Sequence, residues 1–257
     1  MLGAIAGDII GSEYEIKNIK TTEFELFSER SVFTDDTVLT VAVADSILHD
    51  ADLIDKLKGY YNLYPNAGYG ASFIGWASSE SRTPYNSWGN GSAMRVSPVG
   101  FACSTIEDVL LQAQKSAEVT HNHPEGIKGA QAVASAVFLA RTGETKNAIK
   151  KYIEAQFSYS LDEPLDSIRE RYSFDVSCQG SVPQAVTAFL ESAGFEDAVR
   201  KAVSIGGDSD TIACMAGAIA HAFYKEVPEP IMDRVYRILD SKLRQVVTLF
   251  CNRYACL

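Results

Sequence analysis

Basic residues are scarce in this chain relative to acidic ones. Across its 257 residues, 23 lysines and arginines stand against 33 aspartates and glutamates, which gives a formal net charge of -10. Affinity for nucleic acids depends largely on cations that neutralise phosphates, so a generic reader of DNA or RNA is disfavoured. An acidic membrane surface would repel the chain for the same reason. The expected partner is therefore neither a nucleic acid nor a membrane.

Cysteine pairs and long apolar runs are also missing. The cysteines are five and form no CxxC pair: Cys103, Cys178, Cys214, Cys251 and Cys256. Neither a disulfide framework nor a sulfur-rich zinc site is indicated, and a reducing cytoplasm is the expected compartment. Residues 1–10 lack a basic leader and soon meet Asp8, and the apolar stretch 212–223 is shorter than the roughly 20 residues that span a bilayer. We expect residues 1–10 to form a buried helix.

The alternation of apolar and polar residues that marks a strand is rare. Only FELF at 24–27 and SVF at 31–33 are candidates for short extended pieces. Helical spacing of apolar residues instead marks the segments 36–48, 106–119, 127–141, 183–192, 196–204, 211–224 and 231–250. Small residues crowd 129–140 and 213–222, which lets helix axes approach closely. We predict an all-α fold, a compact multi-helix bundle that forms a single domain over residues 1–257.

Glycine, proline, asparagine, serine and tyrosine gather between residues 59 and 100. The simplest interpretation is a pair of connecting loops punctuated by turn residues. Two adjoining loops that are rich in glycine and carry aromatic residues are nevertheless unusual in a helical protein, so a binding role stays open. Residues 158–182 are expected to form a second irregular connection.

Two predicted helices begin with nearly the same acidic sequence, TDDT at 34–37 and DSDT at 208–211. Helix capping is one explanation, because these side chains accept hydrogen bonds from the first turn and gain roughly 0.3–1 kcal/mol from the helix dipole. Capping, however, needs one short polar side chain, whereas each start carries two carboxylates and hydroxyls. Such crowding of like charges is costly unless a cation neutralises them. Oxygen ligands without histidine or cysteine suit Mg²⁺, Mn²⁺ or Ca²⁺.

The four aspartates of these starts are enough to hold two cations roughly 3.5–4 Å apart, with Asp210 or a neighbour as the bridge. A third acidic cluster, Asp8 followed by Glu13 and Glu15, would approach the same site if the first helix packs between the other two. The glycines at 206–207 let the backbone turn sharply and expose N–H groups at a helix start, which favours bound anions.

Short segments along nearly the whole chain carry a family resemblance. They are GAIAGDIIGSEYE (3–15), FTDDT (33–37), GYGAS (68–72), SWGNGSAMRVSPVG (87–100), THNHPEG (120–126) and SIGGDSDTIACMAGAIA (204–220). In these segments and their order the chain resembles the ADP-ribosylglycohydrolase family, which includes the dinitrogenase-reductase-activating glycohydrolases. The resemblance implies an all-α enzyme with two divalent cations, Mg²⁺ or Mn²⁺. It would hydrolyse the bond between C1″ of an ADP-ribose and the modified group.

The resemblance also implies which residues bind the cations. The ligands of one would be Thr34, Asp35, Asp36 and Asp210, and those of the other Asp208, Asp210 and Thr211. Glu15 stands where many members have a mobile acidic residue. Either Glu15 or Asp36 is expected to handle the proton of the water or of the leaving group.

The resemblance gives the glycine-rich loops a role in holding ADP-ribose. Backbone N–H groups that cradle the diphosphate are expected at Gly70, Ser87, Gly89, Asn90 and Gly91. Trp88 takes the place of an aromatic that stacks on adenine, which is worth about 1–3 kcal/mol per base, and a loop-anchoring tryptophan is the alternative. His121 matches a residue near the pyrophosphate or the distal ribose, and a purely structural histidine is the alternative.

The bond that is cleaved is less well defined. The GSEYE segment at 11–15 is closer to members that cleave oxygen-linked ADP-ribose, such as serine-linked, than to those that act on arginine, and O-acetyl-ADP-ribose is also open. One rival is an ADP-ribose-binding protein without turnover, which the complete set of expected ligands disfavours. Another is a helical two-metal nucleotide phosphohydrolase. It is disfavoured because such sites use His-Asp or Glu-Glu pairs, and the chain has one His-Asp, at 49–50, and no Glu-Glu.

Overall fold

The computed structural model describes residues 1–254, and all regular structure in this range is helical. No strand occurs within it, so the predicted all-α fold is confirmed. The helices are α1 (Leu2–Ile16), α2 (Asp35–His49), α3 (Leu53–Leu63), α4 (Ala71–Ala77), α5 (Gly91–Met94), α6 (Ser97–Ala102), α7 (Ile106–Glu118), α8 (Pro124–Arg141), α9 (Lys146–Phe157), α10 (Leu165–Arg171), α11 (Cys178–Leu190), α12 (Phe195–Ser204), α13 (Ser209–Tyr224), α14 (Glu229–Ile238) and α15 (Ser241–Tyr254). Cys256 lies outside the described residues, and the single domain over 1–257 stays a prediction.

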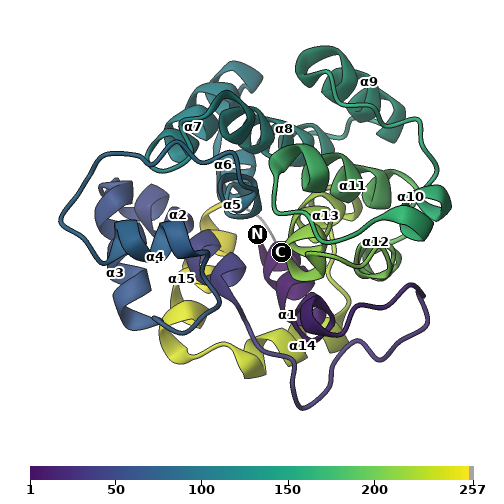
Figure 1. Ribbon diagram of the computed structural model, residues 1–257, viewed down its shortest axis with the longest axis horizontal. Coiled ribbons are helices and arrows are strands. Elements are labelled where there is room, and N and C mark those ends of the chain that lie inside the picture. Colours follow the sequence, from purple (N-terminus) through teal and green to yellow (C-terminus); the bar gives the residue numbers. More distant parts are fainter. Residues whose placement is uncertain (255–257) are drawn as a thin grey trace.

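Helices α1 and α13 form the centre of the molecule and pack together more closely than any other described pair. Figure 1 shows them flanked by α2, α3, α4 and α15 on one side and by α10, α11 and α12 on the other. Glycine makes this contact possible. A Cβ on Gly7 would lie 2.0 Å from the carbonyl oxygen of Ala213, and one on Gly11 would lie 2.5 Å from Cα of Asp210. The start of α13 therefore lies directly against the backbone of α1.

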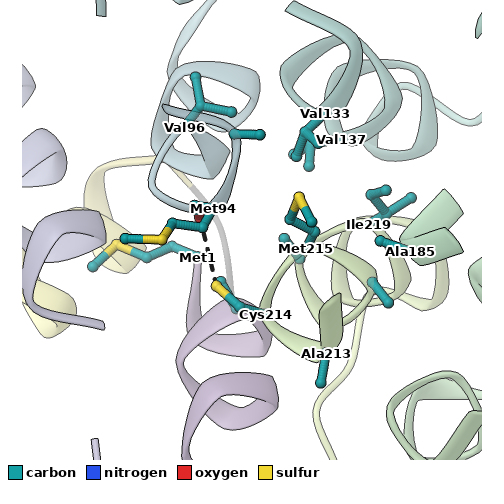
Figure 2. Close-up of a cluster of buried hydrophobic side chains, with 14 of the residues drawn as sticks. Met1, Met94, Val96, Val133, Val137, Ala185, Ala213, Cys214, Met215 and Ile219 are labelled. Atoms are coloured by element: carbon teal, nitrogen blue, oxygen red, sulfur yellow. Dashed lines mark hydrogen bonds between the residues drawn. The ribbon is translucent and has the colours of Figure 1, made fainter. Parts of the chain in front are cut away.

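A second layer of packing holds α13 from the other side. Figure 2 shows Val133 and Val137 of α8 pointing towards Met215 of α13 in the buried core. The thiol of Cys214 lies 3.5 Å from the carbonyl oxygen of Met94, to which it donates, at the end of α5. Because α8, α11 and α12 also contact α13, its position is fixed from several directions.

Some predicted elements differ from the structure. Residues 24–27 and 31–33, the expected extended pieces, form no strand. The single helix expected over 231–250 is wrong, because the chain is extended at Leu239 and a new helix begins after Asp240. The Asp240 carboxylate accepts the N–H of Leu243 at 2.9 Å and so caps that helix.

Other helices were not predicted. Helices α4 and α5 lie inside residues 59–100, the region expected to be loops, and α6 begins inside it. Helix α10 and the start of α11 lie inside residues 158–182. Helices α3 and α9 were also not predicted, because only a narrow line of buried residues runs along each of them. Helix α9 buries only Ile149, Ile153 and Phe157, one residue per turn, which is too sparse to dominate its polar background.

Two structural observations bear on the expected compartment, one on the cysteines and one on the length of the helices. Cys103, Cys178 and Cys214 take no part in disulfides. Within residues 1–254, every helix is too short or too polar to cross a bilayer.

Candidate active site

Three helix ends meet at one side of a cavity of about 580 Å³. They are the C-terminal half of α1 and the first turns of α2 and α13. The remaining lining comes from Leu39, from the glycine-rich residues 68–73 except Tyr69, from residues 85–91, and from five further positions: Met94, Arg95, His121, Phe174 and Val176. The volume lies within the roughly 300–1,000 Å³ typical of sites for small molecules and cofactors.

Asp8 of α1 is fully buried and fixes the start of α2. Its Oδ2 accepts the backbone N–H of Thr34 at 3.0 Å and that of Thr37 at 3.1 Å, together with the Thr37 hydroxyl. Its Oδ1 accepts the Thr34 hydroxyl at 2.6 Å. A carboxylate from another helix thus serves the free N–H groups of this helix start. As a result, α1 determines where the acidic first turn of α2 lies.

Carboxylate oxygens from the three helices come together in two overlapping groups. One contains Asp8, Asp36 and Asp210, and the other contains Glu15, Asp208 and Asp210. Within each group, one oxygen of every residue lies within 4.8 Å of the others. All are buried except Glu15, which is half-buried. Because Asp210 belongs to both groups, it is placed as a bridging ligand would be.

The surroundings disfavour negative charge on these groups. Burial raises the pKa of Asp36 well above its ordinary value, and the neighbouring Asp8 and Asp35 raise it further. Burial and the charge of Asp36 likewise raise the pKa of Asp210. Oδ1 of Asp36 is buried and has no hydrogen-bond partner among the described residues. A bound cation would neutralise the cluster and give this oxygen a partner, so the donor set fits a hard metal ion.

The hydroxyl groups of Thr34 and Thr211 contact the carboxylates. Thr211 donates to Oδ2 of Asp36 at 3.1 Å, and Thr34 donates to Asp8 while accepting the N–H of Asp36 at 3.3 Å. A hydroxyl has one hydrogen and two lone pairs. Each threonine can therefore give its hydrogen to a carboxylate and keep a lone pair for a cation.

Asp208 is held from two sides. The Asn90 side chain donates to its Oδ2 at 2.6 Å. The preceding residue, Gly207, has a φ of 69° and is bound by the amide of Asn18, which accepts the Gly207 N–H and donates to its carbonyl at 3.1 Å. Asn18 also donates to the carbonyl of Glu15 at 2.8 Å. One amide side chain thus connects the end of α1 to the start of α13.

The glycine-rich segment 87–91 pairs with the chain just before α11. The N–H of Asn90 donates to the carbonyl of Val176 at 2.8 Å. The pairing brings Phe174 into the cavity lining together with Trp88. Both rings are exposed, by 56% for Phe174 and 49% for Trp88. Two exposed aromatic rings on one cavity offer flat surfaces for a planar ligand.

The model of the family described as ADP-ribosylglycohydrolase matches residues 1–255. The chain belongs to the ADP-ribosylglycohydrolase family. It is 29% identical over 311 aligned positions to "ADP-ribosylhydrolase ARH3" of Homo sapiens, covering 89% of this chain and 86% of that protein. A protein of Archaeoglobus fulgidus is 28% identical over 272 positions, covering 89% of this chain and 88% of that protein. The solved structure "ADP-ribosylglycohydrolase-related protein complex" shares the fold, with a TM-score of 0.72, 24% identity and coverage of 99% of this chain and 96% of that one.

As a member of the ADP-ribosylglycohydrolase family, the chain is an enzyme that hydrolyses glycosyl bonds. The structure places every residue that the resemblance singled out on the one cavity: Glu15, Thr34, Asp35, Asp36, Gly70, Ser87, Trp88, Gly89, Asn90, Gly91, His121, Asp208, Asp210 and Thr211. Asp35 lines this cavity without belonging to either carboxylate group. Glu13, in contrast, turns away and accepts the Ser28 hydroxyl.

Two predicted contacts differ in their mode. Gly89 was expected to offer its backbone N–H to a diphosphate, but that N–H donates to Oγ of Ser87 at 3.1 Å. Asn90 was expected to offer its backbone N–H to a diphosphate, but that N–H is already bound to Val176. Its side chain instead holds Asp208. Sequence reasoning also missed Arg95 and Phe174, which line the same cavity. Arg95 lies inside the segment 87–100 that carries the resemblance, but the sequence analysis gives it no role. Nothing in the local sequence around Phe174 marks that residue, because only the pairing with segment 87–91 brings it to the site.

Proposed function

We propose that this enzyme is a metal-dependent hydrolase that cleaves the C1″ bond of ADP-ribosylated substrates and releases ADP-ribose. The observation that carries the proposal is the pair of carboxylate groups sharing Asp210 on the same cavity as a glycine-rich segment and two exposed aromatic rings. Such a cavity offers carboxylates for cations that would bind ribose hydroxyls, space for a diphosphate, and aromatic rings on which a base can stack. The name of the human relative, an ADP-ribosylhydrolase, supports the same substrate class.

The cofactors we propose are two divalent cations, Mg²⁺ or Mn²⁺. One would be held by Thr34, Asp35, Asp36 and Asp210, and the other by Asp208, Asp210 and Thr211. Bound cations would supply the positive charge that orients ribose hydroxyls and stabilises developing negative charge. Asp8 is better placed as a brace than as a ligand, because its Oδ2 already accepts three hydrogen bonds from α2.

The aromatic rings are proposed to hold adenine. Trp88 and Phe174 are the most exposed aromatic side chains of the lining, and a base stacked on such a ring gains about 1–3 kcal/mol. Gly89 and Gly91 would let the diphosphate approach the backbone, since neither places a side chain in the cavity. His121, on the same wall, would contact the diphosphate.

Proton handling is assigned to Glu15 and Asp36. Glu15 is half-buried, and burial together with the charge of Asp208 raises the pKa of Glu15. A carboxylate oxygen of Glu15 can exchange protons with solvent and would take the proton of the attacking water. Asp36 is sealed in the cluster, with Thr211 on its Oδ2, and would hold that water in place.

We further propose an oxygen-linked substrate, serine-type or O-acetyl-ADP-ribose, in preference to an arginine-linked one, on the basis of the GSEYE segment at 11–15. A reducing cytoplasm is the proposed compartment, since three buried or half-buried cysteines are outside disulfides.

The direct test incubates the protein with peptides ADP-ribosylated on serine or on arginine, with Mg²⁺, with Mn²⁺ or with a chelator, and measures free ADP-ribose. We expect release from serine that the chelator abolishes and that Asp210→Asn abolishes as well. The matched control is Asp233→Asn, an exposed carboxylate on α14 that should leave release unchanged.

Other outcomes separate the alternatives. Binding of ADP-ribose without release from any conjugate, O-acetyl-ADP-ribose included, would identify a binding protein. Production of AMP or phosphate would identify a phosphohydrolase. Release from arginine alone would overturn the linkage, and full activity of Asp210→Asn would overturn the ligand assignment.

A further inference from the structure

Arg95 is a buried cation whose presence the proposed chemistry does not explain. It follows α5, is completely shielded from solvent, and its Nε and Nη1 have no hydrogen-bond partner among the described residues. Burial lowers the pKa of Arg95 to about 10, so the guanidinium is still charged near neutral pH. No ion pair of the residues 1–254 involves it. Burying an unpaired charge is expensive, so its contacts have to be accounted for.

The remaining nitrogen of Arg95 leads to His121. Nη2 donates to Oγ1 of Thr120 at 2.7 Å and to the carbonyl oxygen of Ser116 at 2.9 Å. Oγ1 of Thr120 in turn lies 2.7 Å from Nδ1 of His121. A guanidinium has donors only, so Thr120 must accept from Arg95.

Because Thr120 accepts from Arg95, its hydroxyl hydrogen is available for Nδ1 of His121, which lies 2.7 Å away. A neutral imidazole whose Nδ1 accepts a hydrogen bond carries its own hydrogen on Nε2. Burial lowers the pKa of His121 well below its ordinary value, and the charge of Arg95 lowers it further, which keeps the ring neutral. The contacts therefore favour a neutral ring that carries its hydrogen on Nε2.

Nε2 of His121 faces the glycine-rich segment. A Cβ on Gly91 would lie 3.1 Å from Nε2, and one on Gly89 would lie 3.8 Å from it. Since both positions are glycine and all three residues line the cavity, neither Gly89 nor Gly91 places a side chain between Nε2 and a ligand there.

We propose that Arg95 is a positioning residue: through Thr120 it fixes His121 as the Nε2–H tautomer and aims that hydrogen at the diphosphate. The identity of this acceptor rests on the proposed function, whereas the tautomer does not. Arg95 borders the cavity but has no exposed surface, and it acts through Thr120 and His121 instead of as a catalytic residue.

The tautomer can be measured without any substrate. In protein labelled with ¹⁵N-histidine, two-bond ¹H–¹⁵N correlation spectra distinguish the protonated ring nitrogen from the bare one, and His121→Gln identifies the signals of His121 among the four histidines. We expect Nδ1 bare and Nε2 protonated in the unmodified protein. In Thr120→Val, which keeps the side-chain shape and removes the hydroxyl, the Nδ1–H form should appear. Thr120→Ser, which restores the hydroxyl, should return the spectrum to its original form.

Binding supplies the second measurement. Calorimetry with ADP-ribose in Mg²⁺ should show about tenfold weaker binding for Thr120→Val and near-normal binding for Thr120→Ser, because one hydrogen bond to a charged oxygen is lost. Arg95→Lys, which keeps the charge but loses the planar fork, should mix the tautomers in the same way.

Two results would overturn the proposal: Nδ1–H in the unmodified protein, or an unchanged Nε2–H form in both Thr120→Val and Arg95→Lys. Thermal unfolding of each variant checks that it folds, and if Arg95→Lys does not fold, Thr120→Val alone decides. If the tautomer is as expected and ADP-ribose does not bind, the substrate assignment fails while the positioning of His121 stands.

Discussion

The variant Gly11→Ala tests whether the contact of α1 with α13 sets the geometry of the carboxylate cluster. The added Cβ would lie 2.5 Å from Cα of Asp210, about 0.9 Å short of the 3.4 Å at which ordinary van der Waals contact begins. It would also lie 2.8 Å from the backbone nitrogen of Asp210, so no side-chain rotation relieves the clash. The start of α13, with its acidic residues, has to move away from α1 by nearly an ångström.

We expect Gly11→Ala to lower the stability of the protein moderately and its activity strongly. Overpacking of this kind costs about 1–3 kcal/mol of the free energy of unfolding. For a protein of this length each kcal/mol lowers Tm by about 2–4 °C, so a decrease of about 2–12 °C is expected. Activity should fall far more, on the order of 100-fold in kcat/KM, because a displacement of about 1 Å in the site is enough for that loss.

The assay combines thermal unfolding, Mg²⁺ titration and ADP-ribose release at a temperature where the variant is folded. Gly59→Ala is the matched control: Gly59 lies inside α3, a Cβ there meets nothing within 4 Å, and alanine should stabilise the helix by about 0.5–1 kcal/mol. The reasoning is refuted if Gly11→Ala keeps unmodified metal affinity and turnover, or if Gly59→Ala loses as much activity.

Two further predictions concern the metal ligands and the base. In metal-free protein the pKa values of Asp36 and Asp210 are raised, so the folded state binds protons more tightly than the unfolded chain. The protonated carboxyls therefore contribute to stability at low pH, and this contribution is lost as the pH rises through the raised pKa values. Thermal unfolding of protein treated with a chelator, measured from about pH 5 to pH 8, should show this loss of stability. Mg²⁺ at 100 times its Kd should add about 2.7 kcal/mol to the free energy of unfolding at the upper end of this pH range. A Tm that changes neither with pH nor with Mg²⁺ would contradict the metal site. Phe174→Ala should raise KM by about tenfold or more through lost stacking, whereas Leu249→Ala, an exposed residue on α15, should not, and equal KM values would remove Phe174 from the base site.

Local chemistry explains which parts of the site could be predicted from the sequence. Both acidic motifs, TDDT at 34–37 and DSDT at 208–211, lie at helix N-termini as predicted. Thr34 caps α2 with its side chain, whereas Asp208 stands at the N-cap position of α13 without a side-chain capping hydrogen bond. The role of Asp8, which binds the N–H groups at the start of α2, could not be predicted from the local sequence. It depends on α1 lying against α2, a tertiary contact that brings Asp8 to Thr34 and Thr37.

Long-range pairing explains most of what was missed. Asn90 was read as a loop residue, yet its side chain reaches Asp208, 118 positions further along the chain. Phe174 enters the cavity only because residues before α11 pair with residues 87–91. The sequence predicts loops where the short helices α4, α5 and α6 lie, because each contains a glycine and turn residues surround it, whereas tertiary packing decides their conformation.

The contact between α1 and α13 also sets a timetable for synthesis. Gly11 and Ser209 are in contact but 198 positions apart, so at 5–20 residues per second the ribosome needs about 10–40 s between them. Residues 2–12 of α1 are all buried in the finished protein. During this interval the face of α1 that will pack against α13 has no partner. Apolar surface that is exposed in this way is prone to aggregation while the rest of the chain is made. Because Asp208 and Asp210 are the last acidic residues of the carboxylate cluster to be synthesised, the complete cluster cannot form before the start of α13 has reached α1.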